Sequence, residues 1–271
     1  MPHRERTRNL LRAIFPFIKP RPADAQSLTT FQRTIRYRFR DTVLLRLALT
    51  HKSSVGPDDK KGLFSNERLE FLGDAVLNCL VTEHLYTLYP TKSEGQLSKV
   101  KSLVVSRKIL GEIAQGFHMG DFLLFGYSEK KSGGNQRLSI MSNAFEAVLG
   151  ALYLDGGLAK ARKFLQTFLF CSIDAFLKDA SNINYKSRIL ELSQRDGFGI
   201  PRYRVVSSTG PEHAKEFTMQ IAIAGVVLGE GGGPNKKVAE QNAARAALVS
   251  YNKEELLIHK KGVAHNELVP D

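Results

Sequence analysis

One stretch decides the fold of this chain: Asn66-Glu67-Arg68-Leu69-Glu70-Phe71-Leu72-Gly73-Asp74-Ala75-Val76-Leu77. In a helix, its carboxylates Glu67, Glu70 and Asp74 stand at i, i+3 and i+7 and share one face. Like charges at this spacing repel each other, so helix stability alone does not favour the stripe. A second face is apolar at helical spacing and consists of Leu69, Leu72, Val76 and Leu80, with Phe71, Ala75 and Cys79 beside them. We therefore predict a mostly buried helix whose acids are buried or line a cleft.

Buried carboxylates must be paired, protonated or bound to a cation. A hard divalent cation with oxygen ligands would satisfy several of them at once. The alternative is a solvated acidic stripe on an amphipathic helix, which is the usual meaning of such spacing when it stands alone.

A second apolar helical run, residues 142–150, carries Asn143 and Glu146 at i and i+3. Together with Glu70 and Asp74, these side chains could converge from two helices on one magnesium ion, or a manganese ion, which prefers octahedral oxygen ligands. Such a metal lowers the pKa of a bound water and neutralises charge on a phosphoryl oxygen. The pattern therefore indicates hydrolysis of a phosphodiester by a metal-bound water.

Composition points to a polyanionic partner. The chain has 271 residues, a net charge of +12, a pI near 9.7 and 42% hydrophobic residues. Such a basic excess is typical of proteins that bind nucleic acid or an anionic membrane surface. Its two cysteines, Cys79 and Cys171, lie in apolar contexts, and we expect buried free thiols in a reducing cytoplasm. We find no run of 18 apolar residues and expect no membrane span.

The pattern divides the chain into five parts. Residues 1–27 are expected to form a basic tail in which prolines exclude a long helix. Residues 28–178 are helical in pattern without a convincing strand, and residues 179–183 mark a linker by their composition. Residues 184–252 have the order α-β-β-β-α of a small α+β domain, and residues 253–271 are expected to form a second tail. The fold class is therefore an all-α domain followed by a small α+β domain.

Local signals place several boundaries. Asp41 can cap a helix, and Ser93 with Gln96 forms a capping box. Residues 55–63 are expected to be a loop and residues 139–154 a helix. In the second half, we expect helices at 185–195 and 236–251, strands at 203–208, 216–223 and 226–229, and a loop at 231–235.

The opening stretch resembles, nearly letter for letter, the signature of the ribonuclease III family, and a twelve-residue match of this kind is very specific. The resemblance implies an all-helical endonuclease domain and places Glu70, Asn143 and Glu146 at metal-ligand positions. The family usually has Asp where Asn143 stands. An amide oxygen can ligate magnesium but carries no charge, so we expect weaker metal binding rather than loss of activity.

By the same resemblance, Asp74 and Glu146 stand at the positions usually called catalytic. Glu67 and Glu94 match two further acids of the same catalytic valley. Each of the last two also has a purely structural interpretation. Glu67 could pair with a neighbouring basic side chain, and Glu94 is a first-turn acid that the helix dipole favours. His51, within a segment that also matches the family, is interpreted as structural.

The second half resembles a double-stranded RNA-binding domain. The resemblance is carried by residues 210–213, 229–233 and 236–244. Duplex RNA is recognised through phosphate and 2′-hydroxyl groups, because its base edges lie in a deep groove. Lys236 and Lys237 open a helix, where the dipole and free amides also favour phosphate.

The family's other RNA contacts are carried onto the first helix and the first strand turn. Glu191 and His213 are expected to face the minor groove. The family usually has Gln where Leu190 stands, and Gln194, one turn later, could replace that contact.

The two resemblances imply a bacterial-type ribonuclease III. Such an enzyme is a homodimer whose two acidic sites lie across one RNA-binding valley, each cutting one strand to leave 5′-phosphate, 3′-hydroxyl and a short 3′ overhang. Expected substrates are precursors of ribosomal, messenger and transfer RNA. The main alternative is a double-stranded RNA-binding protein with a catalytically silent dimerisation domain. A weaker alternative, based on the basic tail, is a structural ribosome-associated protein, for which RNA binding would not depend on duplex structure.

Overall fold

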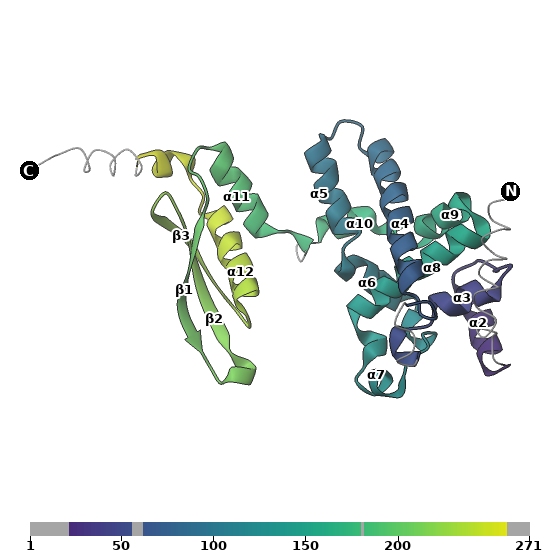
Figure 1. Ribbon diagram of the computed structural model, residues 1–271. Coiled ribbons are helices and arrows are strands. Elements are labelled where there is room, and N and C mark those ends of the chain that lie inside the picture. The colour runs from purple at the N-terminus through teal and green to yellow at the C-terminus, as the bar shows by residue number, and fades with distance from the viewer. Residues whose placement is uncertain (1–21, 56–61, 180–181, 259–271) are drawn as a thin grey trace, which may run out of the picture. The chain divides into compact units, whose positions relative to one another are not determined.

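The computed structural model describes residues 22–55, 62–179 and 182–258 (Figure 1). Contacts between Cα atoms divide the chain after Asn182 into two compact units. The division falls within the predicted linker at 179–183. Each unit is described by itself below.

The first unit is built around two long helices, α4 (Glu67–Leu88) and α8 (Leu138–Gly156), which pack along each other (Figure 1). Leu77, Leu80 and Phe145 are fully buried between these and the surrounding helices. The surrounding helices are α2 (Pro22–Thr34), α3 (Thr42–Ala48), α5 (Glu94–Val104), α6 (Arg107–Gly116), α7 (Tyr127–Lys131), α9 (Leu158–Phe168) and α10 (Ile173–Lys178). Short 3₁₀ turns join them, at η1 (Lys52–Ser54), η2 (Met119–Asp121), η3 (Gly134–Gln136) and η4 (Phe170–Ser172).

The predicted helix caps are confirmed. The Asp41 side chain accepts a hydrogen bond from the backbone N–H of Val43 at the start of α3, and Ser93 and Gln96 form the capping box of α5. Among the described residues of this unit, extended pairing is limited to one isolated bridge between Thr50 and Leu124, as the absence of a strand pattern predicted.

Three expectations for this unit were wrong. Helix α2 begins at Pro22, inside the predicted tail. Proline was expected to exclude a long helix there, but it is well tolerated in the first turn. Cys79 and Cys171 are exposed rather than buried. Phe71 is 82% exposed, because it lies with Cys79 on the side of α4 that faces away from α8. Helical spacing identified an apolar arc but could not tell which part of it meets the core.

The second unit is a three-stranded antiparallel sheet with two helices on one face (Figure 1). Its elements are α11 (Tyr185–Arg195), β1 (Arg202–Thr209), β2 (Glu216–Ile223), β3 (Val226–Gly233) and α12 (Lys236–Val249). The strand order is β1-β2-β3, and a small core forms around Ile189, Ile221 and the alanines of α12. The predicted α-β-β-β-α order is confirmed.

Two boundaries of this unit differ from the prediction. Strand β3 continues to Gly233, through residues that were expected to be a loop. Its glycines are required there because a Cβ at Gly229 or Gly231 would overlap the backbone of α12 near Ala243. Residues 253–258, expected to be tail, are helical, and Leu256 is 1% exposed within the same core.

In neither unit is any described helix long and apolar enough to cross a membrane.

Candidate nuclease site and RNA-binding face

Two glycines allow α4 and α8 to approach each other closely. A Cβ atom at Gly73 would overlap the carbonyl oxygen of Glu146, and one at Gly150 would overlap the backbone of α4. Since a backbone cannot give way as a flexible side chain can, both positions require glycine. The crossing holds Glu70 and Asp74, which lie before and after Gly73 on α4, beside Glu146 of α8.

Glu146 is half-buried at this crossing. Burial raises its pKa to about 7, the charges of Asp74 and Glu70 add to the rise, and Arg107 opposes it. A substantial fraction of Glu146 is therefore protonated at neutral pH. A cation placed among these acids would favour its ionised form.

Glu70 is the second acid that the fold perturbs. Burial raises its pKa, followed by the charge of Glu67, whereas Lys52, Arg107 and a hydrogen bond with the Asn143 side chain lower it. The structure therefore brings Asn143 into direct contact with a predicted metal ligand. Asp74 is exposed, and its Oδ1 accepts a hydrogen bond of 2.8 Å from the Asn78 amide.

The remaining two acids, which the resemblance matches to the same catalytic valley, both lie on the surface. Glu67 is exposed and forms a 3.4 Å ion pair with Lys52, as the structural interpretation expected. Glu94 is exposed at the start of α5, and its Oε1 accepts a 2.7 Å hydrogen bond from Ser98. The electrostatic interactions that shift Glu70 and Glu146 include Glu67 but not Glu94.

The predicted metal ligands are supported by the type of their donor atoms and not by an arrangement of those atoms around one point. Three carboxylates and an amide oxygen at one crossing suit an oxygen-preferring divalent cation. Within the described parts of the chain, however, no three His, Cys, Asp or Glu side chains are grouped closely enough to hold a metal ion. Mutual repulsion between like charges favours spread carboxylates, so the ligand set stays a prediction.

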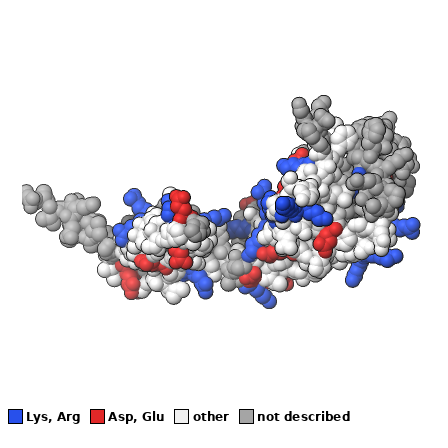
Figure 2. All heavy atoms as spheres, turned by 90° about the horizontal axis from the view of Figure 1, so that it is seen from below, with Lys and Arg blue, Asp and Glu red and all other residues white. Residues whose placement is uncertain are grey.

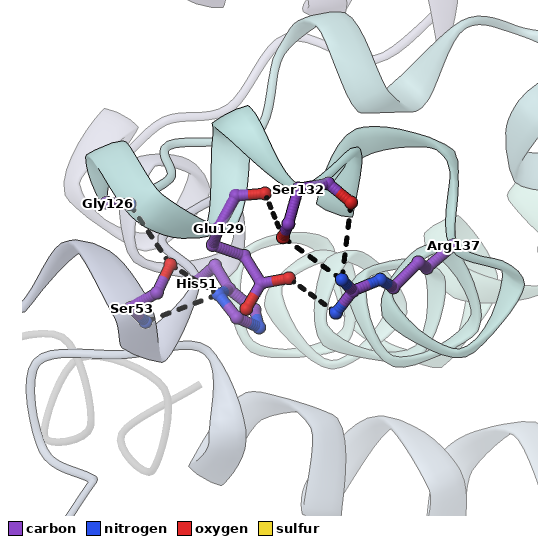
Figure 3. Close-up of polar contacts among 6 residues, drawn as sticks. All are labelled: His51, Ser53, Gly126, Glu129, Ser132 and Arg137. Carbon is purple, nitrogen blue, oxygen red and sulfur yellow. Dashed lines mark hydrogen bonds and ion pairs between the residues drawn. The ribbon is translucent and has the colours of Figure 1, made fainter.

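Sequence reasoning missed two basic residues beside the acids, Lys52 and Arg107. Lys52 lies on η1, next to a polar cluster that joins η1, α7 and the start of α8 (Figure 3). Arg107 is the first residue of α6, after the N-cap Ser106. A cap signal could have located Arg107 at a helix start, but only packing brings it towards acids on other helices.

The first half of this polar cluster centres on His51 (Figure 3). The backbone N–H of Ser53 donates to His51 Nδ1 at 3.2 Å, and Ser53 Oγ lies 2.8 Å from the same atom. Ser53 Oγ also accepts from the N–H of Gly126 at 3.0 Å. Nδ1 is therefore an acceptor, and the ring is neutral; burial, the largest effect, also lowers its pKa. This role agrees with the structural interpretation of His51.

The second half of the cluster fixes the chain before α8. Arg137 Nη1 lies 2.8 Å from Glu129 Oε1, and Arg137 Nη2 donates to Ser132 Oγ at 3.0 Å (Figure 3). Arg137 directly precedes α8, the helix that carries Asn143 and Glu146. The network therefore positions the helix that supplies half of the acid site.

In the second unit, the predicted RNA contacts lie on the surface. Lys236 and Lys237 open α12, whose N-cap Asn235 accepts a hydrogen bond from the N–H of Val238. Glu191 and Gln194 are exposed on α11. His213 belongs to a 3₁₀ turn between β1 and β2, and its side chain lies outside the described residues.

One surface pocket links two of the positions named from sequence. It has a volume of about 510 Å³ and is lined by Leu190 of α11 and Lys237 of α12, together with Ser187 and Gln241. The departure at position 190 therefore lies beside a predicted phosphate contact. On the face drawn in Figure 2, Lys and Arg side chains are spread over both units.

Comparisons with known proteins agree with this geometry. Residues 41–173 match the family model for Ribonuclease-III-like proteins, and residues 185–250 match that for the double-stranded RNA binding motif. The protein named Ribonuclease 3 from Bacillus licheniformis is 41% identical over 231 residues, which are 84% of this chain and 92% of that protein. Ribonuclease 3 from Listeria welshimeri is 39% identical over 217 residues, which are 80% of this chain and 94% of that protein.

Among solved structures, a nuclease domain of ribonuclease III from Campylobacter jejuni is 38% identical and covers 53% of this chain and 94% of that one, with a TM-score of 0.48. The full-length relatives align with both units and with the acid-bearing crossing between α4 and α8. The chain belongs to the ribonuclease III family.

Proposed function

We propose that this chain is an endoribonuclease that hydrolyses phosphodiesters of double-stranded RNA with magnesium or manganese as cofactor. The products are 5′-phosphate and 3′-hydroxyl ends with a short 3′ overhang, and the substrates are precursors of ribosomal, messenger and transfer RNA in the cytoplasm. The observation that carries the proposal is the glycine-mediated crossing that gathers Glu70, Asp74 and Glu146 on a chain that also has a double-stranded RNA-binding unit.

The roles of the residues follow from their positions. Glu70, Asn143, Glu146 and Asp74 would hold the cation, which when bound supplies an activated water and neutralises phosphate charge. Glu146 must lose its proton to bind a cation, and its raised pKa makes that loss pH-dependent around neutrality. Glu67 and Glu94, which are both exposed, would act on the RNA or on metal-bound waters.

The RNA-binding unit would hold the duplex through groups that reach phosphate and 2′-hydroxyl. Lys236 and Lys237 contact phosphates at the start of α12, and Glu191, Gln194 and His213 contact the minor groove. These contacts carry little sequence information, so the unit selects duplex shape rather than base order.

We propose that the protein acts as a homodimer, because one acid set can cut only one strand of a duplex. The exposed side of α4 supports this. Phe71, Ala75 and Cys79 are exposed at i, i+4 and i+8, and Phe71 is 82% exposed. A large apolar side chain exposed to water favours burial against a second copy of the same helix.

A second candidate is a double-stranded RNA-binding protein without cleavage activity. The specific observation in its favour is Asn143, which replaces a charged ligand by a neutral one. Glu70 and Glu146 argue against it, because a silent site has no reason to keep carboxyls with raised pKa values at a glycine crossing.

Cleavage of a long perfect RNA duplex, with and without magnesium, decides between the two. We expect wild type and the control Glu112→Gln, an exposed acid on α6, to give short magnesium-dependent fragments. Glu146→Gln should bind the same duplex and leave it uncut. A duplex that is bound but uncut by wild type at every magnesium concentration would establish the binding protein instead.

A further inference from the structure

Helix α2 ends in a conformation that normally requires glycine. The N–H of Tyr37 donates to the carbonyl of Gln32 at 3.0 Å, and the N–H of Arg36 donates to that of Arg33 at 3.1 Å. This is the Schellman pairing, in which the residue after the helix adopts a left-handed backbone. Here that residue is Arg36, with φ of +52°. Because an L side chain is strained in this region, glycine would be more stable, and an arginine retained there indicates a use for its side chain.

The residues after Arg36 continue as a ridge of arginines. Arg36, Arg38 and Arg40 are exposed, whereas Phe39 is buried and Tyr37 half-buried. The two rings pack edge to face, with centroids 5.0 Å apart. Exposed and buried side chains alternate along residues 36–40, so the three arginine side chains lie on the solvent side of this segment. We call these three side chains the arginine ridge.

The backbone of the ridge is fixed from inside the unit. The Asp155 carboxylate, in a residue only 3% exposed, accepts hydrogen bonds from the Tyr37 hydroxyl at 2.6 Å and from the N–H groups of Arg40 and Asp41 at 3.0 and 3.1 Å. A charged group on a fixed backbone loses less entropy when it binds a partner. The arginine ridge therefore has a fixed backbone, which lowers the entropy cost of binding a partner.

Local stability does not explain these charges. None of the ion pairs among described residues involves the ridge. Arg40 precedes Asp41, the N-cap of α3, and therefore lies at the positive end of a helix, where a cation is unfavourable. The segment 33–46 also has no large exposed apolar side chain that a protein or membrane partner could cover. Planar guanidinium groups without apolar neighbours match phosphate oxygens.

The ridge is separate from the acid site. Asp155, which anchors it, lies nine residues after Glu146 on α8, about 13.5 Å along the helix and half a turn around it. We propose that the arginine ridge binds the phosphate backbone of RNA outside the duplex segment held at the acids. This rests on the RNA-directed function proposed above but not on its chemistry. The bound phosphates could belong to a single strand that flanks the duplex or to a continuation of the duplex. The experiment below distinguishes these two sources.

The test measures binding of full-length protein to three labelled RNAs in EDTA across a KCl series. The probes are a duplex of about 16 base pairs, the span of one RNA-binding unit, and the same duplex with a single-stranded or a duplex extension of about 20 nucleotides. For Arg38→Gln/Arg40→Gln we expect unchanged affinity for the short duplex and about tenfold weaker binding to an extended one at about 0.15 M KCl. The variant removes two positive charges. The slope of log K against log [KCl] should therefore fall in magnitude by about 1.4 if the ridge holds single strand and by about 1.8 if it holds duplex.

Three controls separate charge from structure. Arg38→Lys/Arg40→Lys keeps the charge and should bind close to wild type, and Lys178→Gln removes one exposed charge elsewhere and should change nothing. Arg36→Gly should weaken extended-probe binding while the melting temperature stays equal or rises. Cleavage of the short duplex after magnesium addition reports nuclease function separately and should not change. The proposal would be overturned if Arg38→Gln/Arg40→Gln bound both extended probes with the affinity and salt slope of wild type. It would also be overturned if Arg36→Gly had a lower melting temperature than wild type. The third contrary result would be an Arg38→Lys/Arg40→Lys variant that binds as weakly as the Gln variant.

Discussion

The α4–α8 crossing and the contact of α12 with the sheet both depend on glycines that face another backbone, but their surroundings differ. At the first, Gly73 faces the backbone of Glu146; at the second, Gly231 faces the backbone of α12. Around Gly73 the neighbours are carboxylates, and the pKa of Glu146 rises to about 7. Around Gly231 the neighbours are Ala243 and Asn242, neither of which carries a charge. Close approach of two backbones therefore does not by itself create a reactive site. The residues that surround the glycine decide whether one forms.

The largest effect should come from filling the first crossing. Gly73→Ala puts a methyl group into the Glu146 carbonyl, and neither helix backbone can yield without disturbing the core. We expect a loss of about 3 kcal/mol in the free energy of unfolding and no duplex cleavage. Urea denaturation followed by circular dichroism measures the first, and a gel assay measures the second.

The matched control for this substitution is Gly95→Ala on α5. A Cβ at Gly95 meets nothing within 4 Å. Alanine should therefore keep or slightly raise stability, by up to about 1 kcal/mol, because it restricts the unfolded chain. If Gly73→Ala were as harmless as Gly95→Ala, the helices would be free to separate, and the close crossing would not be what gathers the acids.

Filling the second contact should be less costly and should affect RNA binding rather than chemistry. Gly231→Ala places its Cβ against the backbone of Asn242 and Ala243. We expect about 2 kcal/mol of destabilisation confined to the second unit and weaker duplex binding. Its neighbour Gly232→Ala meets only an ordinary contact at 3.8 Å and serves as control. Hydrogen exchange resolves the two units, and equal protection of the second unit in both variants would contradict the prediction.

The same contrast explains what the sequence could and could not predict. Strand β2 and helix α11 were placed correctly because alternation and helical periodicity are local properties. The glycines of β3 were mistaken for a loop, since glycine is a poor strand former unless another backbone lies on it, and that information is not local. In the first unit, Glu70 and Asp74 were found from the signature and Glu146 from the second apolar run. The exposure of Phe71 and the arrival of Arg107 near them depend on packing, which no local pattern records.

A smaller effect should appear in the pH dependence of stability. The pKa of Glu146 is about 7 in the folded state against an ordinary value of 4.5, so the folded state holds more protons between these values. Stability should therefore fall as pH rises through this window. Because the carboxyl is partly exposed, we expect a loss of about 1 kcal/mol between pH 5 and pH 8 without divalent metal.

Urea unfolding of wild type and Glu146→Gln at several pH values measures this loss. The Gln variant has no proton to lose at position 146, so it should be more stable than wild type at pH 8 and its stability should vary less with pH. Glu112→Gln controls for removal of an exposed acid and should follow the wild-type curve. Parallel curves for all three proteins would show that the crossing does not perturb Glu146.

The smallest effect concerns Asn143, which stands at the crossing where the family resemblance leads us to expect Asp. Asn143→Asp adds a fourth carboxylate beside Glu70 and replaces the hydrogen bond that lowers the pKa of Glu70 with a like charge. Without metal, the variant should be slightly less stable. With metal, the added charge should reduce the magnesium concentration for half-maximal cleavage about threefold, because hard cations gain from each anionic oxygen ligand. Asn143→Ser, which has a shorter neutral oxygen ligand, should shift the requirement the opposite way. Identical magnesium curves for the three proteins would remove position 143 from the ligand set, and the site would then rest on acids that the crossing brings together without it.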